Sequence, residues 1–117
     1  MYDKIAKWIL DGRLPKDLSD TSRLAYGKVT YRRKGQMFDG DAVILLAVLV
    51  ERKYIPSLSY YDFSLRAPAF ERQRSGWECQ IWDKPQTVYA HSNGTPTVAE
   101  AIITALLALI DKDAESI

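Results

Sequence analysis

This chain of 117 residues has few histidines and cysteines, the side chains that titrate nearest to neutral pH. It contains one histidine, His91, and one cysteine, Cys79. No glycine-flanked nucleophile serine, phosphate-binding glycine loop or metal-ligand spacing accompanies the histidine. Because a general base needs a positioned partner, we interpret His91 as a surface or supporting residue.

Cys79 alternates with Trp77 and Ile81, so we predict that it points inward as an inert buried thiol. The carboxylates are scattered, and spacing alone brings no pair of them together; they include Glu71, Glu78, Asp83 and Glu100. We therefore expect a non-enzymatic protein with no cofactor and no metal site.

Arginine and aromatic side chains favour binding instead. Such residues dominate recognition surfaces, because they offer a large rigid contact area with a polar group. The candidate binding residues come from predicted strands, from a basic segment and from a long connection: Tyr26, Arg32, Arg33, Tyr61, Arg66, Arg72, Arg74, Trp82, Tyr89 and His91. On a nearly neutral chain this set suits a small nucleotide ligand, and it suits an acidic protein surface equally well.

Composition limits the partners and the compartment. The formal net charge is +1. A protein that binds duplex through its phosphates needs a stronger positive electrostatic field, so this charge argues against nucleic acid as a partner. A single cysteine excludes an internal disulfide and fits a reducing cytosol. The longest apolar run, residues 42–50, is shorter than the roughly 20 residues that cross a bilayer, and no signal-peptide pattern opens the chain. We expect a cytoplasmic protein without a membrane segment.

The strongest helix signal covers residues 95–110. Two start signals overlap there, Thr95 followed by Pro96, and Thr97 followed three residues later by Glu100. The helix is apolar on most sides, so it must be covered by a sheet and by either another helix or a second subunit. We therefore expect a homo-oligomer.

The remaining pattern predicts one α+β domain over residues 1–117. We expect helices near the N-terminus and at residues 39–53, and a sheet of about four strands at residues 27–33, 54–63, 76–82 and 87–91. The predicted order is α-β-α-β-β-β-α, and a three-layer α/β/α sandwich is one possible arrangement. Residues 1–38 would extend a core formed by residues 39–112.

Alternation in the second half predicts two faces of the sheet. One face would carry Trp77, Cys79, Ile81, Val88 and Ala90 against the helices, and the other Glu78, Gln80, Trp82, Tyr89 and His91, together with Ser59 and Tyr61. The second face either recognises a partner or is covered by the N-terminal helix through Trp8 and Ile9. The start of the last helix offers a further anion site.

Several motifs resemble a known family. They are Asp41-Ala42 before an apolar helix, Gly76-Trp77-Glu78-Cys79-Gln80-Ile81-Trp82, Val88-Tyr89-Ala90-His91, and Thr95-Pro96-Thr97 before Glu100. Over residues 39–111 the pattern resembles the phage ABA sandwich proteins and, more distantly, the NinX-like phage proteins. The resemblance implies helix–sheet–helix layering and an accessory phage protein in the cytosol of a bacterial host.

By analogy with such accessory proteins, we expect an anti-defence inhibitor that binds and sequesters a host immune protein. Two alternatives are an oligomeric sponge for a nucleotide immune signal and a nucleic-acid-binding module.

Overall fold

The computed structural model describes residues 2–31, 35, 37–61, 76–84, 87–91 and 94–115. The elements in chain order are α1 (Tyr2–Leu10), the short 3-10 helix η1 (Pro15–Asp17), α2 (Asp20–Thr30), α3 (Asp39–Ala42), α4 (Ile44–Glu51), β1 (Ile55–Tyr61), β2 (Gly76–Lys84), β3 (Thr87–His91) and α5 (Val98–Glu115). The strands form an antiparallel sheet in the order β1-β2-β3. The predicted α+β class is confirmed.

The predicted strand at residues 27–33 is wrong, and with it the four-stranded sheet and the predicted element order. Residues 27–30 instead belong to α2, whose N-terminus is capped by the Ser19 Oγ accepting from the Ser22 backbone N–H at 3.1 Å. Ser22, Ala25 and Val29 are buried at helical spacing. The short alternation around Val29 resembled a strand, but the buried stripe that begins earlier determines the structure.

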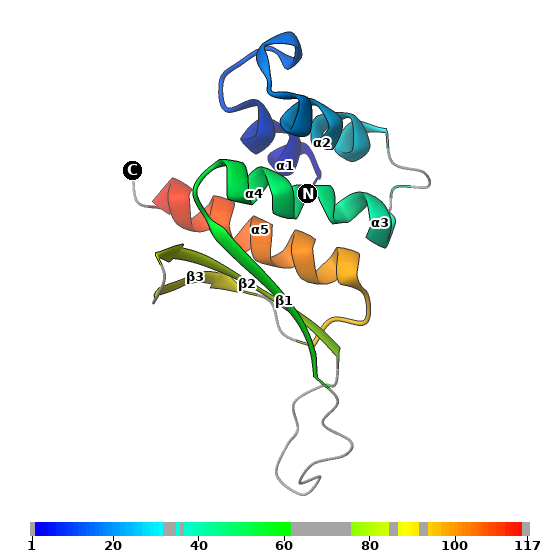
Figure 1. The fold of residues 1–117 in the computed structure, drawn as a ribbon, viewed down its shortest axis with the longest axis vertical. Coiled ribbons are helices and arrows are strands. Elements are labelled where there is room, and N and C mark those ends of the chain that lie inside the picture. The colour runs from blue at the N-terminus through cyan, green and yellow to red at the C-terminus, as the bar shows by residue number, and fades with distance from the viewer. Residues whose placement is uncertain are drawn as a thin grey trace, which may run out of the picture.

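The helices lie on one side of the sheet (Figure 1). α5 packs on β2 and β3, α4 contacts β1, and α1 packs against both α2 and α5. The described elements therefore form helix, helix and sheet layers, so the α/β/α sandwich is wrong. The N-terminal helix does not cover the second face of the sheet, because α1 lies beyond α5.

α5 uses the second of its two predicted start signals. The Thr97 Oγ1 accepts from the Glu100 N–H at 3.1 Å, and the Asp39 carboxylate accepts from the Ala99 N–H at 2.9 Å. Ile103 is only 4% exposed, and Leu107 and Ile110 pack half-buried against the core. The chain itself covers most of this apolar helix, so α5 no longer provides a reason to expect an oligomer.

The predicted helix over residues 39–53 is present but interrupted at Val43, between α3 and α4. After α4, the Tyr54 N–H donates to the Leu49 carbonyl at 2.9 Å and the Lys53 N–H donates to the Val50 carbonyl at 3.0 Å. Together with the positive φ of Lys53, 71°, these bonds form a Schellman C-cap. The cap ends α4 and directs the chain into β1.

Glu51, at the end of α4, holds α2 in place. Its Oε1 accepts from the Ser19 Oγ at 2.6 Å and from the Ser22 Oγ at 3.2 Å, and Ser22 is fully buried.

We expect Glu51→Ala to lower the free energy of unfolding by about 2 kcal/mol, because the buried hydroxyl loses its acceptor. Urea denaturation measures the change. Asp83→Ala, at an exposed position, should stay within about 0.5 kcal/mol of wild type; equal effects of the two substitutions would contradict this role.

Candidate functional site

The register between β1 and β2 separates the two faces of the sheet. Cys79 and Ile81 are fully buried beneath the helices, and they pair with Leu58 and Pro56. The intervening pairs therefore lie on the opposite face, since side chains alternate along a strand and directly paired residues share a face. We call this set the outer face: Ile55 with Trp82, Ser57 with Gln80, and Ser59 with Glu78.

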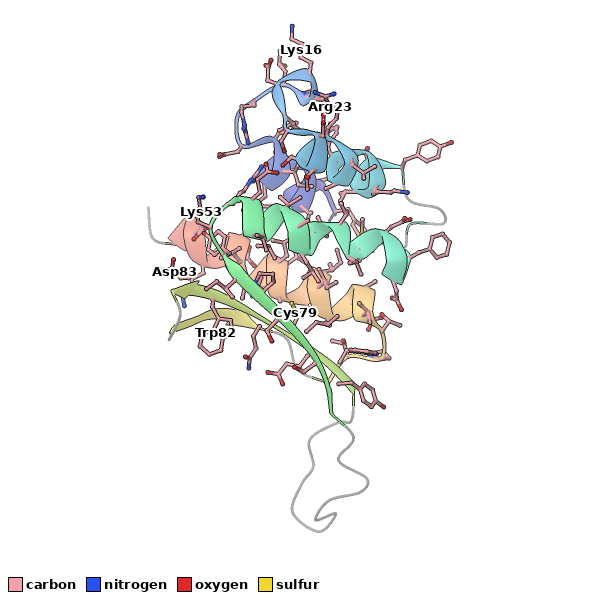
Figure 2. All side chains as sticks on the ribbon, viewed as in Figure 1. Lys16, Arg23, Lys53, Cys79, Trp82 and Asp83 are labelled. Atoms are coloured by element: carbon pink, nitrogen blue, oxygen red, sulfur yellow. The ribbon has the colours of Figure 1, made fainter. Side chains whose placement is uncertain are left out.

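The outer face is apolar at one end and polar at the other. Ile55 is 47% exposed and lies opposite Trp82, which Figure 2 shows on the side of the sheet away from the helices. Towards the other end, the Gln80 Nε2 donates to the Glu78 Oε1 at 2.8 Å. None of the described helices lies over this face. An aromatic and an aliphatic side chain beside fixed polar groups form the kind of surface that binds proteins.

The structure divides the predicted binding residues. Trp82 lies on the outer face, whereas Tyr26 packs half-buried against the core from α2, away from the sheet, so it does not belong to the same site. The register places Tyr61 opposite Gly76 and His91 opposite Gln80, and Tyr89 lies in β3 at an irregularity of the pairing. The side chains of these three strand residues lie outside the described part. The five predicted arginines also lie outside the described residues: Arg32, Arg33, Arg66, Arg72 and Arg74.

The pairing of β3 departs from the predicted faces. Ala90 pairs with Ile81, but Val88 pairs with Trp82, and the register shifts between them. The bulge therefore sets Val88 and Ala90 opposite residues of different faces, although simple alternation predicted one shared face.

Ile55 is a site residue that sequence reasoning missed. The segment around it shows no clean apolar face, so its register could not be assigned from alternation alone. The only sequence signal was that Ile55, Ser57 and Ser59 occupy every second position of their segment, as Glu78, Gln80 and Trp82 do in theirs.

The predicted anion site at the start of α5 is filled by the chain itself. The Asp39 carboxylate occupies the Ala99 N–H, and Thr97 occupies that of Glu100. Both groups satisfy N–H donors that an external phosphate would need. A phosphate at this position would also meet the negative charge of Asp39, so the site favours no nucleotide.

Two observations bear on nucleophilic and metal chemistry in the part of the chain that the structure describes. Burial raises the pKa of the Cys79 thiol to about 11, so the thiolate is scarce near neutral pH. Within the described ranges, no group of three or more His, Cys, Asp or Glu residues could hold a metal ion.

No helix among the described residues is long and apolar enough to cross a membrane.

A scan of protein-family models finds no match for this chain, and searches of curated proteins and of solved structures find none either. The resemblance to phage ABA sandwich proteins stays a prediction.

Proposed function

We propose that this chain is a non-enzymatic binding protein that captures a protein partner on the outer face of its sheet and thereby prevents the partner from acting. The observation that carries the proposal is the pair of exposed Ile55 and half-buried Trp82, on a face over which no described helix lies (Figure 1). Exposed apolar side chains bordered by polar groups mark interaction sites.

The chemistry of the outer face specifies the kind of partner. Ile55 and Trp82 provide an apolar contact, and Glu78 provides a carboxylate that Gln80 holds in position. A partner that presents an apolar side chain next to a lysine or arginine would satisfy both ends. The six residues that define this face include a carboxylate and no cation, so the face suits a protein better than a polyanion.

The biological setting rests on the resemblance. If the chain is an accessory phage protein, its partner is a component of host immunity in the bacterial cytosol, and the chain is an anti-defence inhibitor. Sequestration needs affinity and abundance, but no catalytic group. The nucleotide sponge is less favoured, because Asp39 already occupies the start of α5.

Lysine substitutions at Ile55 or Trp82 are expected to weaken capture, because a charge would be buried at the apolar end of the interface. The tagged wild-type chain is incubated with a bacterial lysate, and the retained protein is identified by mass spectrometry and purified. Calorimetry on the reconstituted pair should then show affinity reduced at least about tenfold for Ile55→Lys and for Trp82→Lys.

Val50→Lys is the matched control. Val50 is a branched aliphatic residue that is 58% exposed on α4, so the same charge is introduced on a different surface. Circular dichroism should show all three variants folded, and Val50→Lys should bind as wild type does. Retention of no host protein, or equal binding by all variants, would contradict the proposal. Heat from cyclic nucleotides or ADP-ribose derivatives in the same calorimeter would favour the sponge instead.

A further inference from the structure

Gly27 lies in the interior of α2, where the structure gives no reason for a glycine. A glycine inside a helix destabilises that helix relative to alanine. The residue is exposed, its φ is not positive, and a Cβ atom built on it would meet nothing within 4 Å. The described fold of one copy would therefore accept a side chain at this position.

An apolar patch surrounds Gly27. Leu24 is 53% exposed, Phe38 62% and Tyr31 90%. Two shallow hollows of about 390 and 240 Å³ share Gly27 and Lys28. We call this surface the α2 patch; its hollows are lined by Asp20, Arg23, Leu24, Gly27, Lys28, Tyr31, Phe38 and Asp41.

The central residues of the α2 patch form one stripe along the helix. Asp20, Leu24 and Gly27 of α2 and Tyr31 at its C-cap follow one another at spacings of four, three and four residues. Residues at these spacings lie on the same side of a helix. Along the stripe lie, in order, a carboxylate, a branched aliphatic side chain, the space left by the missing side chain of Gly27, which we call the gap, and a phenol.

We infer that α2 pairs antiparallel with α2 of a second copy of this chain. A two-fold axis midway between Leu24 and Gly27 places the Leu24 side chain of each copy over the gap at Gly27 of the other. The missing side chain lets the two helices approach closely, because the residues at the contact set the interaxial distance.

The same axis sets Asp20 level with Tyr31 of the second copy. The Asp20 side chain is exposed, with Arg23 3.9 Å away, and Tyr31 is almost fully exposed. The carboxylate can accept a hydrogen bond from the phenol hydroxyl. The same position of the two-fold axis therefore places Leu24 over the gap at Gly27 and Asp20 level with Tyr31.

Charge also favours a second copy. The α2 patch carries two acids, Asp20 and Asp41, and two bases, Arg23 and Lys28, with Lys28 already 3.1 Å from Asp41. A balanced patch does not repel its own copy, and antiparallel helix dipoles attract. Arg23 and Lys28 lie about 140° apart around the helix, so the register does not bring them together.

Gly27→Gln tests the inference. Glutamine forms helices better than glycine and should leave thermal stability equal or higher, but it fills the gap that receives Leu24. Sedimentation equilibrium up to about 0.5 mM should show a wild-type dimer, and the dissociation constant should rise at least about tenfold for Gly27→Gln. Gly40→Gln is the control, because Gly40 is also exposed and helical with open space around it, yet lines neither hollow.

A cross-linking experiment tests the register. An equimolar mixture of Leu24→Cys and Gly27→Cys chains should form a disulfide-linked dimer on mild oxidation, since positions 24 and 27 face each other; the native Cys79 is buried. Leu24→Cys mixed with Val50→Cys should give only background.

A monomeric wild type at the highest concentration, or a Gly27→Gln variant that dimerises as wild type does, would overturn the inference. Ile55→Lys should leave self-association unchanged, so this result is separable from capture on the outer face.

Discussion

Replacing Arg52 with methionine is expected to lower the free energy of unfolding by about 3 kcal/mol. The Arg52 guanidinium donates from Nη1 to the Trp8 carbonyl and from Nη2 to the Ile9 carbonyl, and its Cζ lies 4.6 Å from the centre of the Trp8 ring. It therefore caps the C-terminal carbonyls of α1 from the end of α4. Methionine keeps much of the volume but loses the charge and both donors.

Burial lowers the pKa of Arg52, and the nearby charge of Asp11 acts in the opposite direction. Desolvation offsets part of the gain, which is why we expect less than the sum of two charged hydrogen bonds and a cation–π contact. Arg52→Lys should lose roughly half as much stability as Arg52→Met, because an ammonium keeps the charge but not the planar pair of donors.

Arg13→Met is the control for Arg52. Arg13 is exposed, and its Nε donates to the Leu10 carbonyl at a long 3.4 Å. Its loss should change stability by no more than about 0.5 kcal/mol. Urea denaturation followed by circular dichroism gives all three values. An Arg52→Met variant as stable as Arg13→Met would show that α1 does not depend on this contact.

Gly76→Ala is expected to cost about 3 kcal/mol or more, or to prevent folding. Gly76 has a φ of 153°, and an added Cβ would lie 2.5 Å from the Thr95 carbonyl oxygen and 2.9 Å from the Gly94 carbonyl carbon. Backbone atoms cannot move aside as a flexible side chain would. The neighbouring Trp77 and Thr95 exchange two backbone hydrogen bonds, of 2.8 and 3.0 Å, so the clash would disrupt the link between β2 and the approach to α5.

Gly40→Ala provides the comparison for Gly76, because a Cβ atom at Gly40 meets nothing within 4 Å. This variant should be as stable as wild type or slightly more stable. Yield of soluble protein and thermal melting compare the stability of the two variants. A Gly76→Ala protein that melts with wild type would disprove the close approach at Thr95.

The sequence predicts those elements whose signals are local. Thr97 with Glu100 marks the start of α5, and the alternation around Cys79 marks β2; both are present. The strand prediction fails over residues 27–30, because a short alternation after a glycine looks like a strand, whereas Ser22, Ala25 and Val29 form a helical stripe.

Contacts between distant residues could not be predicted. Asp39 caps the N–H of Ala99, 60 positions away, and Arg52 caps carbonyls more than 40 positions earlier. Similarly, Trp82 follows from alternation, but its neighbour Ile55 depends on strand register. Such register depends on the tertiary packing of the helices over the inner face, which no local pattern encodes.

The most direct test of the outer face is side-chain footprinting with hydroxyl radicals, performed on the free chain and on its complex with the captured protein. In the free chain, Ile55 and Trp82 should react while the buried Ile81 is protected. In the complex, Ile55 and Trp82 should become protected, and Val50 should react as before. Protection of Val50 with unchanged labelling of Ile55 and Trp82 would contradict the outer face as the binding surface.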